Sequence, residues 1–425
     1  MTIGAARGLA PARTALDNGA VVIVQETTAI PAVTIDATFL AGSVYEPADL
    51  PGLVYLTGRV LDRGTDRRSG ERIAEELDDR GVSLRILTTR HTLGISCTCL
   101  VEDFDDMLAL VVDVARRPTF PETEIAKRRA EAITAIRQDD DNPAVRAVES
   151  AFVLLYGAEH PYARRAKGTP ASLERMDSAV LSEYHRRHVV PASLSLVVVG
   201  DVRAERVVDR AAAELSGWRG TKPDPVIVPD PPLAVGRRRH VVVMPGKSQT
   251  DIAYGFTTIR RLDDRYYAYW MMNNVLGQFG LGGRLADNIR ERQGMAYYAF
   301  SSCEPNIGPG PLLVRAGVDP INVERAIEAI DKEVRELGAA GPTAIEVAET
   351  RDYLTGSIPR LFETNQAIAA FLQTTEMFGL GLDYDRRLPA LLAAVTQEQV
   401  AAAAAEVLRP DVAAVAIAGP HEAEG

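Results

Sequence analysis

The sequence predicts an α+β fold of two homologous halves, each made of two α/β subdomains with mixed or antiparallel sheets flanked by helices. The chain has 425 residues, which is too long for one ordinary hydrophobic core. Strand-like and helical patterns alternate along it. Residues 191–200 read PASLSLVVVG and residues 410–419 read PDVAAVAIAG, so proline and glycine recur at one offset of 219 residues. A repeat this long indicates duplicated domains.

In the first half, strands are expected where Val and Ile are dense, and helices where apolar residues recur with a helical period. Gly81 would end the second helix as a C-terminal cap. The expected strands are 20–25, 32–40, 82–88, 92–100 and 193–199, and the expected helices are 50–62, 70–80, 104–116, 122–139 and 172–187.

Residues 217–239 show neither pattern and are rich in proline, which favours an extended linker. We therefore expect an N-terminal domain at 1–220, a linker at 221–239 and a C-terminal domain at 240–425. In the second half the expected strands are 251–257, 297–303 and 312–318, and the expected helices are 263–276, 284–293, 323–337 and 344–361.

Composition restricts the partners and the compartment. The net charge is −11, which argues against a nucleic-acid partner because such a partner needs a basic surface. Cys97, Cys99 and Cys303 provide no disulfide framework. The N-terminus lacks the plan of a signal peptide, and no uncharged apolar run reaches the ~18 residues that a spanning helix needs. We therefore expect a cytoplasmic protein without a membrane segment.

Residues 51–65, PGLVYLTGRVLDRGT, have the frame of a zinc-peptidase helix without its ligands. In His-x-x-Glu-His, two imidazoles lie one helical turn apart and the glutamate acts as base toward the metal-bound water. The flanking Ala-Gly-Ser at 41–43, Pro47 and Gly64-Thr65 follow in the expected order. From about residue 16 to residue 419, the chain resembles the M16 peptidase family, which includes pitrilysin and the mitochondrial processing peptidase.

The resemblance implies that each metal-site position of this chain has lost its function. The two histidine slots hold Tyr55 and Arg59, the glutamate slot holds Gly58, the third-ligand slot holds Ala135, and the assisting glutamate is Arg128. An arginine stays protonated and repels a cation, whereas glycine and alanine offer no ligand. A neutral phenol is a poor zinc ligand. We expect no metal in this chain, and zinc in a partner subunit.

A second zinc site elsewhere in the chain is not expected. Of the six histidines, only His185 and His188 are close in sequence, and they lie beside arginines at the end of a predicted helix. A cation near a helix C-terminus is favoured by the helix dipole. We expect these two side chains at a solvated helix end.

The second half keeps another family signature, Arg290 and Tyr297, seven residues apart. In the family, an arginine and a tyrosine with this spacing reach the active site from the other domain. A guanidinium and a phenol can donate hydrogen bonds to a peptide carbonyl and to the oxyanion that develops on it. The simpler alternative is a solvated helix charge and a strand aromatic. Tyr298 points to the opposite strand face and is the weaker candidate.

Ahead of this signature lies a glycine-rich segment with Gly280, Gly282 and Gly283. It follows a helix and lacks the strand-then-helix context of a nucleotide-binding loop. Its position resembles the substrate-binding loop of the non-catalytic α subunit of mitochondrial processing peptidase. The alternative is that these glycines only permit a tight turn between helices.

The resemblance implies a zinc-free subunit of a heterodimeric metalloendopeptidase that acts on peptides or unfolded polypeptides. Its partner would be an M16 subunit with an intact His-x-x-Glu-His, and Arg290 and Tyr297 would act in trans. Two alternatives remain. One is a structural subunit like the core proteins of the respiratory bc1 complex. The other is a non-catalytic homodimer that binds extended peptides at a sheet edge.

Overall fold

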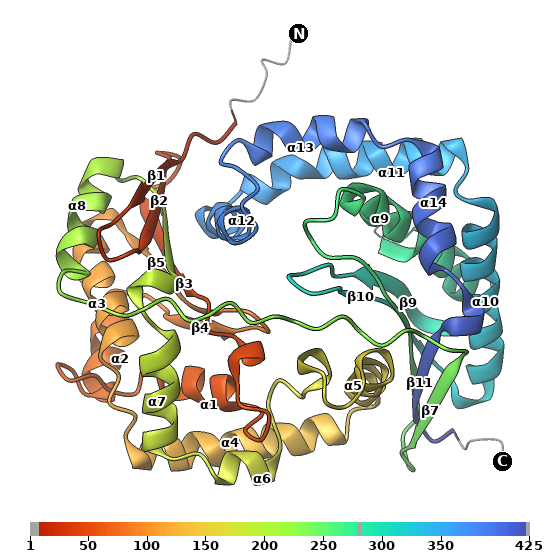
Figure 1. Ribbon diagram of the computed structural model, residues 1–425, viewed down its shortest axis with the longest axis horizontal. Helices are drawn as coiled ribbons and strands as arrows, with labels where there is room; N and C mark the ends of the chain where they lie inside the picture. Colours follow the sequence, from red (N-terminus) through yellow and green to blue (C-terminus); the bar gives the residue numbers. More distant parts are fainter. Residues whose placement is uncertain (1–7, 279–281, 422–425) are drawn as a thin grey trace. The chain divides into compact units, whose positions relative to one another are not determined.

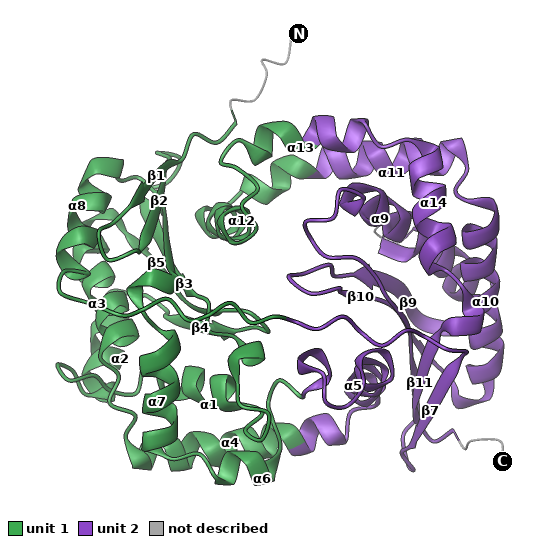
Figure 2. Ribbon diagram, viewed as in Figure 1, with its two compact units in different colours: residues 1–136, 165–227, 358–388 green, residues 137–164, 228–357, 389–425 purple. Residues whose placement is uncertain are grey.

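A computed structural model of the chain describes residues 8–278 and 282–421 (Figure 1). The chain forms two compact units, which Figure 2 shows in different colours. Unit 1 contains residues 1–136, 165–227 and 358–388, and unit 2 contains residues 137–164, 228–357 and 389–425. Each unit has one mixed sheet with helices packed against it, which confirms the predicted fold class.

The sheet of unit 1 has six strands in the order β1-β2-β6-β3-β5-β4. Strand β6 runs parallel to β2 and antiparallel to β3. Strand β4 is outermost and pairs with β5 alone within the sheet. The strands are β1 Ala12–Ala15, β2 Val21–Glu26, β3 Ala32–Phe39, β4 Arg85–Thr88, β5 Leu93–Leu100 and β6 Leu194–Gly200.

The sheet of unit 2 has five strands in the order β7-β11-β8-β10-β9. Strand β11 runs parallel to β7 and antiparallel to β8, and β9 is outermost. The strands are β7 Arg238–Val243, β8 Thr250–Thr257, β9 Ala296–Cys303, β10 Pro311–Val318 and β11 Ala414–Gly419. Apart from β1, the two sheets therefore share one topology.

The repeated segments detected in the sequence occupy equivalent places. Residues 191–200 form a short turn and strand β6, and residues 410–419 form a short turn and strand β11. Both strands end in a glycine with positive φ, 153° at Gly200 and 154° at Gly419. A Cβ at Gly200 would lie 2.2 Å from the carbonyl oxygen of Ala32, so the close approach of β3 requires glycine there.

Helices complete each unit. In unit 1 they are α1 Leu53–Val60, α2 Gly70–Asp78, α3 Phe104–Arg116, α4 Glu122–Asp140, α6 Pro170–Glu174, α7 Ser178–His188, α8 Ala204–Glu214 and α12 Asn365–Met377; α4 continues into unit 2. In unit 2 they are α5 Pro143–Tyr156, α9 Tyr266–Asn273, α10 Val323–Ala340, α11 Ala344–Ser357 and α14 Gln397–Val407; α13 Tyr384–Ala393 belongs partly to each unit.

Each unit contains one helix from the other half of the sequence. Helix α5, from the first half, packs on β8 and β11 of unit 2. Helix α12, from the second half, packs on β3 and β6 of unit 1. Figure 2 shows this exchange by colour, since α5 has the colour of unit 2 and α12 that of unit 1. The compact units therefore differ from the consecutive ranges 1–220 and 240–425.

Two expected boundaries need correction. Strand β7 begins at Arg238, inside the expected linker, because its main chain pairs in parallel with β11. The single helix expected at 172–187 is two helices, α6 and α7. Asp177 ends the first segment because its carboxylate accepts the Val180 N–H at 2.9 Å and so caps α7.

Within the described ranges, no single helix has the length and apolar composition needed to cross a bilayer. The helical segments 384–393 and 397–412 reach that length and composition only when they are taken together, and they are bent by 88°.

The docking of α12 explains why β6 reads as a continuous apolar run. One face of β6 places Leu196 and Val198 in the main core of unit 1. The other face places Val197 and Val199 against Ile368, Ala369 and Leu372 of α12. A strand covered on both faces needs apolar residues at successive positions instead of alternate ones.

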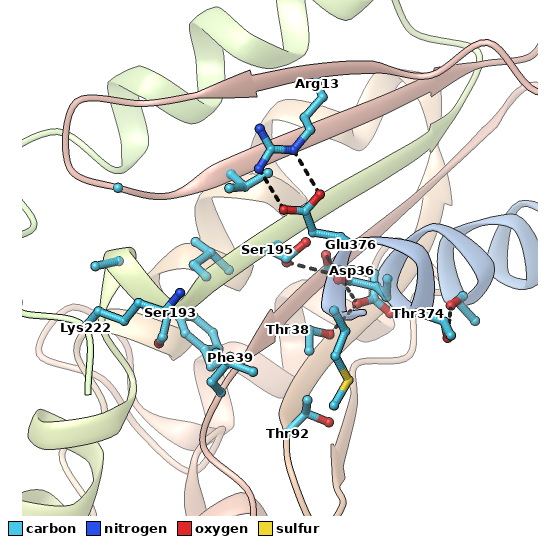
Figure 3. A pocket seen from close by; sticks show the side chains of 18 residues that line it. Arg13, Asp36, Thr38, Phe39, Thr92, Ser193, Ser195, Lys222, Thr374 and Glu376 are labelled. Atoms are coloured by element: carbon cyan, nitrogen blue, oxygen red, sulfur yellow. Dashed lines mark hydrogen bonds and ion pairs between the residues drawn. The ribbon is translucent and has the colours of Figure 1, made fainter. Parts of the chain in front are cut away.

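Gln373 fastens α12 to the sheet. Its amide donates to the carboxylate of Asp36 at 2.8 Å, to the Asp36 carbonyl at 3.0 Å and to the Ser195 carbonyl at 3.0 Å. Burial raises the pKa of Asp36, although hydrogen bonds from Thr38 and Gln373 oppose that shift. Figure 3 shows this contact beside a cavity of about 420 Å³, where Arg13 forms a two-point contact with Glu376.

Gln373→Leu is expected to destabilise unit 1 by about 1–3 kcal/mol, because the buried acceptors of Asp36 and Ser195 lose a donor. Urea unfolding followed by circular dichroism measures the change. Gln366→Leu, at an exposed position of the same helix, is the control and should stay within about 0.5 kcal/mol of wild type. Equal effects of the two substitutions would contradict the fastening role.

Candidate functional site

Helix α1 begins at a fixed point. The carboxylate of the buried Glu46 accepts the N–H of Gly52 at 3.2 Å and that of Val54 at 2.7 Å, an arrangement that the helix dipole favours. Gly52 has a φ of 90°, and a Cβ there would lie 2.6 Å from the carbonyl oxygen of Lys167. Only glycine fits this entry to the helix. The start and the rotation of α1 are thereby set.

With that rotation, one stripe of α1 faces a cavity of about 440 Å³. Tyr55, Gly58, Arg59 and Asp62 follow the spacing of a single helix face. The structure thus brings four of the five predicted zinc-site positions, Tyr55, Gly58, Arg59 and Arg128, to one cavity, whereas Ala135 is not among the lining residues. The lining consists of Tyr55, Gly58, Arg59, Asp62, Arg63, Leu84, Ile86, Leu87, Thr88, Arg128, Ala166 and Lys167.

An ion pair joins α1 to α4 at this cavity. Nη2 of Arg59 lies 2.7 Å from Oε2 of Glu131, and both side chains are a little over one third exposed. Arg128 binds the same carboxylate at 2.8 Å. Hydrogen bonds from Arg128 and Arg59 lower the pKa of Glu131. The guanidinium of Arg59 also lies 5.8 Å from the ring centroid of Tyr55, within the range of a cation–π contact.

Gly58 offers no metal chemistry, and its surroundings also leave no room for a larger side chain. A Cβ at Gly58 would lie 2.8 Å from Cγ2 of Thr88 and 3.3 Å from Cγ2 of Ile86. Strand β4 therefore packs into the space that a larger side chain would need. A glutamate cannot be placed here without moving β4.

The third-ligand and assisting positions lie on α4. Ala135 is half-buried and follows Glu131 by one helical turn, so the two side chains share a face. Arg128 is bound to Glu131 at 2.8 Å and lies 3.6 Å from Glu124. The nearby carboxylate of α4 is therefore held by arginines.

These residues do not fit a zinc ion. The stripe of α1 offers a phenol, a glycine and an arginine, and the carboxylate beside it is held by two guanidinium groups. In the part of the chain that the structure describes, no three His, Cys, Asp or Glu side chains are grouped to hold a metal.

The expectation of a solvated helix end at His185 and His188 is wrong. Both side chains are buried, because α7 turns them toward the core. Nε2 of His185 lies 2.7 Å from the carbonyl oxygen of Ala115. Burial lowers the pKa of each histidine to about 4, so both are neutral near pH 7.

The residues Gly64 and Thr65, which matched the family frame, are held by a buried carboxylate. Asp113 is 1% exposed and accepts the Thr65 hydroxyl at 2.7 Å. Arg68 and Arg117 pair with the same carboxylate at 2.7 and 3.0 Å. This cluster fixes the loop after α1 and gives the frame a structural role.

Arg290 and Tyr297 lie in unit 2. Arg290 is in the helical segment Ala286–Arg292, is about two fifths exposed, and lies 3.5 Å from Glu291. Tyr297 is 86% exposed on the outermost strand β9. The register skips it, since Tyr298 faces Gly317 and Ala296 faces Val318. Tyr297 is therefore the extra residue of a β-bulge, a feature that redirects a side chain.

Tyr298 is already engaged. Its hydroxyl donates to the buried carboxylate of Asp251. Burial, and next the contact with Asp251, raise the pKa of this phenol. Tyr297 is thus the more accessible of the two phenols, and it owes this position to the bulge.

The glycine-rich segment is only partly described. Gly280 lies outside the described residues. Gly283 has a φ of 87°, and a Cβ there would lie 2.9 Å from the Cα of Gly277. This contact between two glycines supports the tight-turn alternative for Gly283. Gly282 is half-exposed.

Sequence comparison identifies the family. The profile described as insulinase (peptidase family M16) matches residues 21–160, and the profile of the peptidase M16 inactive domain matches residues 175–354. The chain belongs to the M16 peptidase family. It is 25% identical to an uncharacterized zinc protease of Streptomyces coelicolor, covering 95% of this chain and 89% of that protein. An uncharacterized zinc protease of Mycobacterium leprae is also 25% identical, with 98% and 93% covered.

Two solved structures share the fold. The peptidase M16 inactive domain from Pseudomonas fluorescens matches with a TM-score of 0.89 at 24% identity, covering 98% of this chain and 99% of that one. A protease from Helicobacter pylori matches with a TM-score of 0.88 at 17% identity, covering 96% and 99%.

The sequence analysis did not single out several residues that lie at the degenerate zinc site. Glu131, which binds Arg59, was not singled out, although its helical spacing from Ala135 places both on one face of α4. Asp62 and Arg63, in the turn that follows α1, also line the cavity. Their place directly after the degenerate motif was the available signal.

Gly58→Ala is expected to destabilise the protein by about 1 kcal/mol. Helix propensity alone would favour alanine by about 1 kcal/mol, but crowding a packed site costs about 1–3 kcal/mol. Chemical unfolding measures the sign of the change in the free energy of unfolding. Thr88→Ser removes the methyl group that the new Cβ would meet, so the loss should disappear in that background. A stabilising effect of Gly58→Ala in the wild-type background would contradict the packing argument.

Proposed function

We propose that this chain is the zinc-free subunit of a heterodimeric M16-type metalloendopeptidase that cleaves peptides or unfolded polypeptides. The observation that carries the proposal is the Arg59–Glu131 pair, because Arg59 occupies one expected ligand position and Glu131 lies one helical turn from another, Ala135. A chain with this site needs the metal of another polypeptide. The partner proposed is an M16 subunit with an intact His-x-x-Glu-His.

Arg290 and Tyr297 are proposed to act in trans at the zinc site of that partner. Tyr297 is exposed at a bulge of the outer strand, and Arg290 lies on the helical segment that precedes this strand. Nε of Arg290 lies 3.5 Å from Oε1 of Glu291, and the arginine side chain is 41% exposed. The phenol and the guanidinium would hydrogen-bond the carbonyl oxygen of the scissile peptide, and would stabilise the negative charge that develops there.

Substrate would bind as an extended strand. Strand β4 is the outermost strand of unit 1, so one row of its main-chain groups has no partner within the sheet. Leu87 on β4 is 67% exposed and offers an apolar contact. Addition of a strand to such an edge gives affinity through main-chain hydrogen bonds. The same observation favours a second candidate, a homodimer that binds peptides without cleaving them.

The compartment proposed is the cytoplasm. The three cysteines form no disulfide, and Cys97 and Cys99 are buried. Unpaired thiols suit a reducing compartment.

The isolated chain is expected to hold no stoichiometric zinc and to cleave no peptide, with or without added zinc. The reason is that the α1 stripe offers no ligand set and Arg59 keeps its charge. Metal analysis of the dialysed protein and a fluorogenic peptide assay test this. One tightly held zinc ion per chain would overturn the proposal.

Mixing with the zinc-bearing M16 chain of the same organism is expected to produce hydrolysis. Arg290→Ala or Tyr297→Phe should lower kcat of the mixture by about a hundredfold, the usual effect of losing an oxyanion donor. Arg292→Ala is the matched control, because this exposed arginine pairs with Asp287 on the same helical segment. Hydrolysis that is unchanged in both test variants would exclude the role in trans.

A further inference from the structure

The cavity of the degenerate zinc site is lined mainly by cations. Four lining side chains, Arg59, Arg63, Arg128 and Lys167, are basic, and one, Asp62, is acidic. Positive charges therefore outnumber negative ones among the lining residues, although the protein as a whole carries −11. Glu131 and Glu124 of α4 balance part of this positive charge.

The acidic neighbours satisfy only part of these guanidinium groups. Glu131 takes one Nη of Arg59 and one Nη of Arg128. Nε of Arg63 lies 3.1 Å from Asp62, without the geometry of a hydrogen bond. The side chains of Arg59 and Arg63 line the cavity and are 37% and 35% exposed, so part of each guanidinium stays accessible to a ligand. A ligand that offers charged acceptors to these donors would bind favourably.

We propose that this cavity binds a carboxylate, and that it selects extended peptides bearing one. Arg59 of α1 and Arg63 of the turn that follows the helix both line the cavity, so their planar guanidinium groups can bind a single carboxylate together. The inference rests on the proposed function only in that the ligand is a peptide.

The wall opposite the arginines suits the rest of such a peptide. Ile86, Leu87 and Thr88 of the outer strand β4 line the same cavity. A strand added to β4 would run along the mouth of the cavity and place a side chain inside it. A glutamate or aspartate side chain, or the C-terminal carboxylate of the peptide, supplies the same chemistry. The lost metal ligands would thus have been replaced by an anion-binding site.

Isothermal titration of the full isolated chain tests this proposal. Three octapeptides of one sequence are compared. The first has a central glutamate and blocked termini, the second has glutamine in its place, and the third has glutamine with a free C-terminal carboxylate. The glutamate peptide, the free-terminus peptide, or both should bind at least about tenfold tighter than the blocked glutamine peptide, and the tighter one identifies the source of the carboxylate. Raising the salt concentration should reduce the difference.

The preference for peptides that bear a carboxylate is expected to disappear in the double variant Arg59→Gln/Arg63→Gln. Arg72→Gln is the matched control, because Arg72 is 57% exposed on α2 and lies outside the cavity. If the double variant does not fold, Arg63→Gln alone should fold and lower the preference, since the Arg63 side chain is about one third exposed. Equal binding of all three peptides, no binding of any, or a preference that survives Arg59→Gln/Arg63→Gln would overturn the proposal. Hydrolysis by the mixed subunits with equal peptide binding would overturn this inference alone and leave the proposed function standing.

Discussion

The contact between Arg59 and Glu131 determines what the first half of this M16 chain can do. It joins α1 to α4. In an active family member, a metal ion bound by ligands from two such helices makes that connection, whereas here two side chains of opposite charge make it. Because hydrogen bonds from Arg128 and Arg59 lower the pKa of Glu131, the carboxylate stays ionised to a lower pH than a free glutamate. An arginine keeps its proton, which disfavours a metal ion beside it.

The packing around α1 also disfavours a metal site. Thr88 and Ile86 of β4 approach Gly58 closely, so the outer strand fills the volume that a catalytic glutamate would occupy. The buried Asp113 holds the loop that follows the helix. The family frame has thus been kept for its packing, while the chemistry within it has changed.

The two units depend on a reciprocal exchange of helices. The central strands β6 and β11 are apolar on both faces, and each is covered by a helix from the other half of the sequence, α12 and α5 respectively. Each sheet has two edge strands. In each unit one of them, β4 or β9, carries or lies beside the residues proposed for function. An outer strand is suited to this because part of its main chain has no strand partner, and because a bulge such as that at Tyr297 is tolerated there.

The sequence by itself determined the α+β class, the duplication and the loss of zinc ligands. These follow from local information: periodicity, the repeated turn and strand at residues 191–200 and 410–419, and residue types that cannot bind a metal. Only the tertiary structure decided that Glu131 binds Arg59, that His188 is buried, and that α12 covers β6. Each of these features depends on residues that are far apart in the chain. A periodic pattern shows that a face is apolar, but it does not show which element covers that face. The cationic lining of the cavity also arises only when α1, β4 and α4 come together.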